Sequence, residues 1–134
     1  MKKTICLLLV CTALLSGCVA VGLTALGVGM ATGVSHTLSG IVYKTFSTTQ
    51  ANVKRATLAA LNHMHIKVVS TKKEKSAEII IAKAADREIE IELEALTDNT
   101  TRMSATAKVS GGIMRDSATA TEIIIQTEKL LGPT

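Results

Sequence analysis

The clearest pattern in the chain is a strict alternation of apolar and acidic residues between positions 88 and 95. The apolar positions are Ile89, Ile91, Leu93 and Ala95, and the acidic positions are Glu88, Glu90, Glu92 and Glu94. Because successive side chains of a strand point to opposite faces, this spacing predicts a β-strand with one buried and one wet face. Residues 102–109 repeat the alternation after the turn residues Asp98-Asn99, which predicts a neighbouring antiparallel strand.

Further strands are predicted wherever β-formers cluster between turn residues. These segments are residues 40–46, 66–71 and 77–84. In the last of them, Ile79 and Ile81 share one face. The short turns at residues 72–75 and 85–87 imply that strands next to each other along the chain pair antiparallel.

A helix is predicted over residues 51–64, which are mostly good helix formers. Ser47 and Gln50 have the spacing of a capping box at its start. Its apolar stripe, interrupted only by the hydroxyl of Thr57, consists of Val53, Ala56, Ala60 and Leu61.

A second helix is predicted to run to Leu131, with Asp116 or Ser117 as its cap and Gly132-Pro133 at its end. The residues expected to face the sheet are Ala118, Thr121, Ile124, Ile125 and Leu131. The predicted order is therefore β-α-β-β-β-β-α. Since each element must bury an apolar face, we expect an α+β fold, a two-layer sandwich whose antiparallel sheet of about five strands carries two helices on one face.

The amino-terminal residues have the layout of a secretory targeting segment. Two lysines precede an apolar run, Ile5 to Leu15, that is too short to span a bilayer as a helix. The run closes on Leu15-Ser16-Gly17-Cys18, which resembles the lipobox of bacterial lipoprotein signals. This resemblance implies diacylglycerol on the Cys18 thiol, cleavage between Gly17 and Cys18, and acylation of the new amino terminus by a fatty acid such as palmitate.

Three regions follow from this interpretation: a signal peptide at 1–17, a lipidated, glycine-rich apolar tether at 18–38, and the α+β domain at 39–134. Glycine disfavours helix, so the composition of the tether favours a linker. The spacing of Gly29 and Gly33 also fits a helix that self-associates in lipid. An uncleaved membrane helix that continues through the apolar part of the tether is the remaining alternative.

Charge and cysteine usage narrow the function only slightly. The chain has 15 basic and 11 acidic residues, a formal net charge of +4. Loss of Lys2 and Lys3 with the signal leaves 13 basic residues and a net charge of +2, which gives no support to a nucleic-acid partner. Cys6 and Cys11 lie in the predicted signal, so the mature chain keeps only Cys18 and no disulfide is expected.

Two groups of polar residues are candidates for chemistry. His63 and His65 lie near a predicted helix end, where they suit its negative dipole, and no third ligand accompanies them, so no metal site is expected. The glutamates at 88–94 fit either a surface for a cation or basic partner, or a solvated face neutralised across strands by Arg102 and Lys108.

Catalysis has no support in the sequence. The chain contains no G-x-S-x-G elbow, no phosphate-binding loop and no H-E-x-x-H motif. We therefore expect neither enzymatic activity nor a cofactor.

The whole pattern resembles a family of small bacterial lipoproteins of unknown function. The features that carry this resemblance are the lipobox, the glycine-rich tether, the strand–helix–strand start, the run Leu96-Thr97-Asp98-Asn99-Thr100-Thr101-Arg102 and the terminal helix after Gly111-Gly112. The resemblance implies an envelope lipoprotein with this domain, and it implies no activity.

We therefore expect a lipid-anchored envelope protein whose domain binds protein or stabilises an envelope assembly, in the periplasm or at the surface. In a cell with two membranes the outer one is favoured, because Val19 follows the cysteine where Asp would favour the inner one. The alternatives are a ligand carrier or enzyme that uses a helix–sheet cleft, and a membrane-active oligomer built by the tether.

Overall fold

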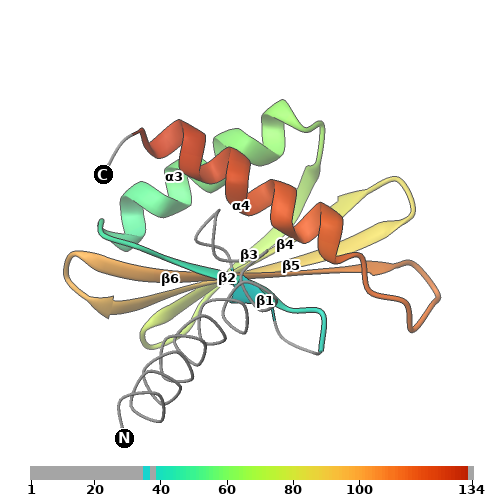
Figure 1. Ribbon diagram of the computed structural model, residues 1–134, viewed down its shortest axis with the longest axis horizontal. Helices are drawn as coiled ribbons and strands as arrows, with labels where there is room; N and C mark the ends of the chain where they lie inside the picture. The colour runs from blue at the N-terminus through green and yellow to red at the C-terminus, as the bar shows by residue number, and fades with distance from the viewer. Residues whose placement is uncertain (1–34, 37–38, 133–134) are drawn as a thin grey trace, which may run out of the picture. The chain divides into compact units, whose positions relative to one another are not determined.

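The structure is a computed structural model that describes residues 35–36 and 39–132. The strands of this part are β1 (Ser35–His36), β2 (Val42–Phe46), β3 (Lys67–Lys73), β4 (Ala77–Ala84), β5 (Arg87–Thr97) and β6 (Thr100–Val109). Its helices are α3 (Gln50–His63) and α4 (Ser117–Leu131). Figure 1 shows the two helices lying side by side above the sheet.

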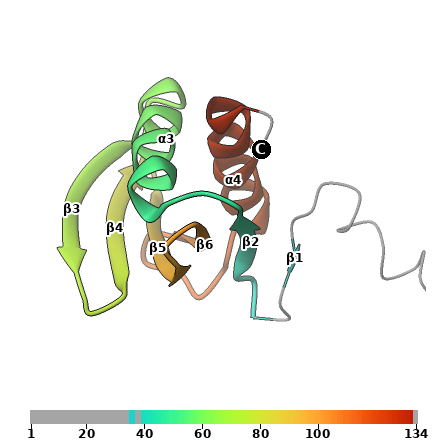
Figure 2. The ribbon, with the colours of Figure 1, turned by 90° about the vertical axis from the view of Figure 1, so that its left-hand side faces the viewer.

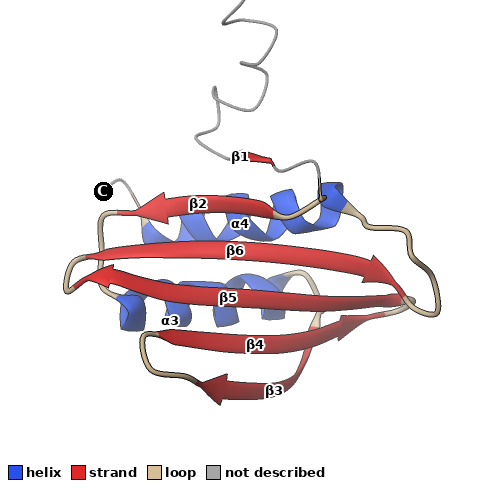
Figure 3. Cartoon of the chain, turned by 90° about the horizontal axis from the view of Figure 1, so that it is seen from below, coloured by secondary structure: helices blue, strands red, loops and turns tan. Residues whose placement is uncertain are grey.

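The strands form one antiparallel sheet in the order β1-β2-β6-β5-β4-β3. Both helices pack on the same face, with α4 against β6 and β2 and α3 against β5, β3 and β6 (Figure 2). The predicted α+β fold and its element order are confirmed. The opposite face of the sheet carries no helix of the described residues (Figure 3).

The sheet begins earlier in the chain than predicted. The two-residue strand β1 pairs with β2 through Ser35 opposite Tyr43 and His36 opposite Val42. It falls within the range predicted as the tether, where two residues are too few to show an alternation. The predicted lipidation and cleavage residues Gly17 and Cys18 lie outside the described residues.

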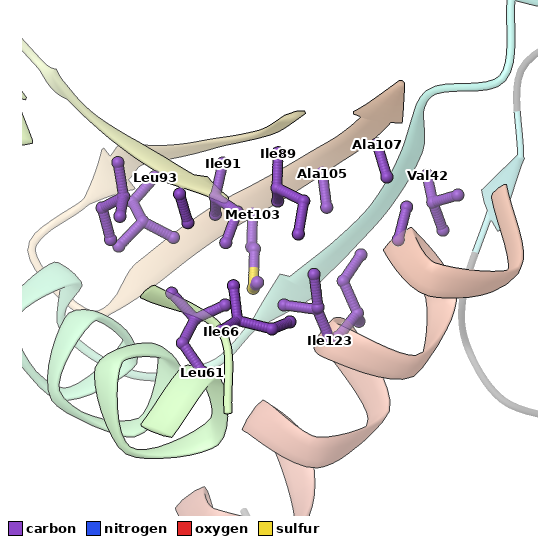
Figure 4. Close-up of a cluster of buried hydrophobic side chains, with 14 of the residues drawn as sticks. Val42, Leu61, Ile66, Ile89, Ile91, Leu93, Met103, Ala105, Ala107 and Ile123 are labelled. Atoms are coloured by element: carbon purple, nitrogen blue, oxygen red, sulfur yellow. The ribbon is translucent and has the colours of Figure 1, made fainter. Parts of the chain in front are cut away.

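The core between the sheet and the helices is aliphatic (Figure 4). From β5 and β6 it receives Ile89, Ile91, Leu93, Met103, Ala105 and Ala107, each at most 1% exposed. Leu61 of α3 and Ile123 of α4 close it from the helix side. The alternation predicted for both strands is therefore confirmed, with the glutamates of β5 on the other face.

Helix α3 has the predicted apolar stripe but a different start. Thr49 is the N-cap, and its hydroxyl accepts the backbone N–H of Asn52 at 3.3 Å. The predicted capping box of Ser47 and Gln50 is wrong, because Gln50 is already the first helical residue. Its side-chain amide instead donates to the carbonyl of Leu93 at 2.7 Å and so fastens the helix to β5.

Helix α4 has the predicted cap, Asp116, but a different buried face. Its buried residues are Ala120, Ile123, Ile124 and Thr127. The prediction was wrong for Ala118, which is exposed, and for Thr121 and Ile125, which are only partly buried. Three consecutive isoleucines fit several helical phases equally well. The cap decides between them, because the N–H of Asp116 donates to the carbonyl of Ala107 in β6 at 2.8 Å.

Candidate functional site

The sheet face opposite the helices is the most distinctive surface of the domain, and we call it the open face (Figure 3). Its side chains follow from the alternation and the register of the strands. They include Tyr43 and Thr45 of β2, Arg102, Ser104, Thr106 and Lys108 of β6, Glu88, Glu90, Glu92 and Glu94 of β5, Ile79, Ile81 and Lys83 of β4, and Ser70 and Lys72 of β3. The four predicted glutamates thus form a column down the middle of this face.

The two ends of the glutamate column are neutralised by basic residues. Arg102 donates through Nη2 to Oε2 of Glu94 at 2.5 Å. At the other end, Lys83 Nζ lies 3.4 Å from Oε1 of Glu88, and Lys108 is the cross-strand neighbour of Glu88 in β6. The predicted neutralisation is therefore found for Arg102 with Glu94, whereas the ion pair of Glu88 is with Lys83 and not with Lys108.

The centre of the column is different. Glu90 lies between Thr106 of β6 and Ile81 of β4, and Glu92 lies between Ser104 and Ile79. Both side chains are exposed, and neither carboxylate takes part in a hydrogen bond or ion pair within the described part of the chain. Two unpaired carboxylates therefore stand beside two half-buried isoleucines and small hydroxyl residues.

Two shallow hollows flank these central carboxylates. One of about 190 Å³ lies beside Tyr43, between Glu92 and Arg102. The other, of about 180 Å³, lies between Glu90 and Lys108. Sites for drug-sized molecules usually measure roughly 300–1,000 Å³ and enclose their ligand. Each hollow therefore suits a single side chain of a partner better than a whole small molecule.

In the part of the chain that the structure describes, the helix layer has no cleft toward the sheet. Aliphatic side chains fill the space between the helices and the sheet (Figure 4), where the ligand-carrier alternative needs a cleft. A hollow of about 260 Å³ lies on the outside of the layer instead, beside Arg55 and Ala59 of α3 and Leu130 of α4. Among the described residues, no buried polar side-chain atom lacks a hydrogen-bond partner.

The two candidate histidines do not meet other ligands. His63 ends α3, and His65 follows it with a φ of 56°; both side chains are exposed. In the described part of the chain, no group of three His, Cys, Asp or Glu residues is placed to hold a metal ion. None of the helices described there is long and apolar enough to cross a membrane.

Among the carboxyl groups of the described residues, Asp116 is the one whose pKa the fold clearly lowers, from 3.8 to about 2. The main cause is the backbone N–H of Thr119, followed by the hydroxyl of the same residue, while partial burial acts in the opposite direction. Arg87 contributes further by donating through Nε to Oδ2 of Asp116 at 2.5 Å. This arrangement caps α4 and ties it to β5, so its role is to hold the fold together.

Sequence reasoning missed the apolar part of the open face. Tyr43, which is 36% exposed, and the half-buried Ile79 and Ile81 lie on this face beside the glutamates. Residues 77–84 are apolar on both sides of the strand, so their alternation could not reveal which side the helices cover. The run Ile79-Ile80-Ile81 could have indicated this apolar surface. Successive side chains of a strand point to opposite faces, so at least one of these isoleucines has to lie outside the core.

A family model described as "Protein of unknown function (DUF3568)" matches residues 3–128 of the chain. The chain belongs to this family. The match covers the predicted signal, the tether and nearly all of the domain. No protein with a curated description matches the chain.

Proposed function

We propose that this member of the DUF3568 family is a lipid-anchored bacterial envelope protein whose domain binds another protein through the centre of the open face. The observation that carries the proposal is the contrast within the glutamate column. Glu88 and Glu94 have basic neighbours, whereas Glu90 and Glu92 are exposed without an ionic partner among the described residues.

Such a surface fits a partner that brings a lysine or arginine. Hydrogen bonds between a cationic side chain and a carboxylate are short and strong, and they gain strength when water is excluded. Tyr43, Ile79 and Ile81 supply apolar surface around the two carboxylates. A partner that covers all of these would combine an apolar interface centre with two charge-assisted contacts.

The proposed anchor rests on the lipobox at Leu15-Ser16-Gly17-Cys18. Each buried methylene of an acyl chain contributes about 0.8 kcal/mol, and stable anchoring needs more than one chain. Diacylglycerol on Cys18 together with an acylated amino terminus meets this requirement. Val19 at the following position favours the outer membrane.

The alternatives have less support. A carrier or enzyme would need an enclosed cleft with convergent polar groups, whereas the described helix–sheet interface is filled with aliphatic side chains. An oligomer built by the tether would depend on Gly29 and Gly33, which lie outside the described residues. A detergent-resistant assembly that is lost on substitution of these glycines would favour it.

Site-specific crosslinking in cells tests the proposed binding surface. A photo-crosslinking amino acid at position 92 should form an adduct with one discrete envelope protein. The matched control is position 122, where an exposed glutamate of α4 lies on the helix layer. An absence of adducts at position 92, or the same adducts at both positions, would contradict the proposal.

The anchor is tested separately by labelling cells with a fatty-acid analogue. The wild-type protein should take up the label and Cys18→Ser should not. Label retained by Cys18→Ser would show that the acylation site, if there is one, lies elsewhere.

A further inference from the structure

The loop between β6 and α4 carries two consecutive apolar side chains that the domain leaves in water. Ile113 is 100% exposed and Met114 is 72% exposed. Among the large hydrophobic residues of the described part, these two are the most exposed. Single exposed apolar residues are common on protein surfaces, but two adjacent ones at a loop tip form a small continuous apolar surface.

Backbone hydrogen bonds hold this loop in a defined shape. The N–H of Val109 donates to the carbonyl of Met114 at 3.0 Å, and the N–H of Gly112 donates back to the carbonyl of Val109 at 3.0 Å. Lys108 and Arg115 form an antiparallel bridge at its base. Gly111 adopts a φ of 77°, which residues with a side chain rarely do. An ordered turn therefore presents Ile113 and Met114.

The loop lies beside Ser39 and Gly40, the residues that lead into β2. The guanidinium of Arg115 donates from Nη1 to the carbonyl of Ser39. The side chain of Arg115 also packs on Gly40, so closely that an added Cβ at this glycine would lie 3.0 Å from its Cδ. Figure 3 shows the β6–α4 loop at the same end of the sheet as the start of β2. The apolar tip and the segment that leads into β2 are therefore neighbours.

This end of the domain also carries more basic than acidic residues. The strand register and the hydrogen bond from Ser110 to Asp86 bring these residues together. The basic ones are Lys67, Lys83, Arg87, Lys108 and Arg115, and the acidic ones are Asp86, Glu88 and Asp116. Apolar side chains flanked by an excess of basic residues suit the surface of a bilayer with anionic headgroups.

We infer that Ile113 and Met114 insert into the lipid surface that carries the anchor and form a second membrane contact. The inference rests on the proposed lipidation of Cys18. The 18 residues from Cys18 to Ser35 could reach at most roughly 60 Å when fully extended. The lipid alone would therefore leave the orientation of the domain undetermined. The loop contact turns one end of the strands toward the bilayer and keeps the open face, which runs along the strands, accessible to a partner.

The test uses the full-length protein, processed in cells, purified from membranes and reconstituted into vesicles of phosphatidylethanolamine and phosphatidylglycerol. Ile113→Cys is labelled with an environment-sensitive fluorophore, and doxyl-labelled lipids serve as quenchers. The matched control is Asn99→Cys, in the exposed β5–β6 turn at the opposite end of the sheet. Flotation of the vesicles and the number of fluorophores per chain report on the anchor, because an acylated Cys18 cannot be labelled.

The expected result is that the protein floats, and that doxyl lipids quench the probe at position 113 several-fold more strongly than the probe at position 99. Equal and weak quenching at both positions in protein that floats would overturn the loop contact and leave the anchor intact. A probe at position 113 that is shielded from water and from doxyl lipid, with disulfide crosslinks between two copies through this position, would overturn it in favour of self-association. Protein that does not float, with two fluorophores per chain, would overturn the anchor and the loop contact together.

Discussion

Arg87, the first residue of β5, donates through Nε to Oδ2 of Asp116, the N-cap of α4, at 2.5 Å. The same carboxylate accepts the backbone N–H of Thr119 at 3.0 Å and the hydroxyl of Thr119 at 2.7 Å. The N–H of Asp116 in turn donates to Ala107 of β6. One residue thus fixes the start of α4 to two strands, which determines the helical face that reaches the core.

The pKa of Asp116 gives this arrangement a specific pH dependence. The folded state lowers this pKa from 3.8 to about 2, so the ionised form stabilises the fold above roughly pH 4, and the contribution is lost as the pH falls toward 2. Asp116→Ala should lower the free energy of unfolding by about 0.5–2 kcal/mol at pH 7, the usual cost of losing an N-cap. Urea unfolding of the wild type and the variant at pH 7 and at pH 2 measures this loss at each pH.

The loss in free energy of unfolding caused by Asp116→Ala should be smaller at pH 2 than at pH 7. Asp116→Asn is the control, because asparagine caps helices about as well as aspartate but carries no charge. It should lose less stability than the alanine variant at pH 7. A deficit of the alanine variant that is the same at both pH values would argue against a stabilising role for the ionised carboxylate.

The alternation in β5 predicts opposite effects for neighbouring substitutions. Ile91 is fully buried, while Glu92 next to it is exposed on the open face. Ile91→Ala should lower the free energy of unfolding by about 2–5 kcal/mol, because it leaves a cavity in the core. Glu92→Ala should change it by about 0.5 kcal/mol or less. Equal losses in thermal or urea unfolding would be incompatible with a two-layer fold.

The fold could be predicted from the sequence where apolar and polar residues follow the regular spacing of a single type of secondary structure. In β5 and β6 every second residue is polar or charged, so the buried face of each strand followed directly. In α4 the apolar run Ile123-Ile124-Ile125 fits more than one helical phase, and the choice depends on the hydrogen bond between Asp116 and Ala107. That contact joins residues whose proximity only the folded chain reveals.

The candidate site was predictable to a similar degree. The glutamate row was visible as a strand face, and neutralisation by Arg102 was anticipated, whereas Glu88 pairs with Lys83 instead of the expected Lys108. Which glutamates remain unpaired depends on the register of β5 with both of its neighbours, which places Glu90 and Glu92 beside hydroxyl and aliphatic side chains. The lipobox, in contrast, is a local pattern that is interpreted from the sequence alone.

Two inward-facing ion pairs join the helices to the sheet and lead to a further prediction. Lys54 of α3 donates to Glu78 of β4, and Lys44 of β2 lies 2.5 Å from Glu128 of α4. The side chain of Glu78 is only 12% exposed, so removal of Lys54 leaves a largely buried carboxylate unpaired. Lys54→Ala should lower the free energy of unfolding by about 1–3 kcal/mol.

A double substitution separates the loss of the ion pair from the cost of leaving the carboxylate of Glu78 unpaired. Lys54→Met combined with Glu78→Leu should recover most of the stability, because the unpaired charge is then gone. Lys83→Ala, which breaks the exposed pair with Glu88 at 3.4 Å, is the control and should cost about 1 kcal/mol or less. Urea unfolding of the four proteins checks the series. A Lys54→Ala loss no larger than the control would mean that water screens this pair as well.

The domain should fold without the predicted signal and tether. The buried side chains of the described core come from residues 42–127, and residues 35–36 add only the short edge strand β1. A chain of residues 39–132 should therefore melt cooperatively and give a dispersed amide spectrum. A chain of residues 35–132 should melt at a slightly higher temperature, because it retains β1. Collapsed amide resonances in the shorter chain would show that the fold depends on the preceding residues.

The last prediction concerns the charge at the centre of the open face. If Glu90 and Glu92 contact a basic partner, Glu90→Lys with Glu92→Lys should abolish the photo-crosslinked adduct, measured with the crosslinker placed at Tyr43 in the same face. Like charges would then be juxtaposed at the contact, which costs several kcal/mol at an interface. The fold should tolerate both changes, because the two side chains are exposed, and Glu122→Lys on the helix layer should leave the adduct unchanged. An adduct that persists at its wild-type level, in protein that melts cooperatively, would show that the partner does not use these carboxylates.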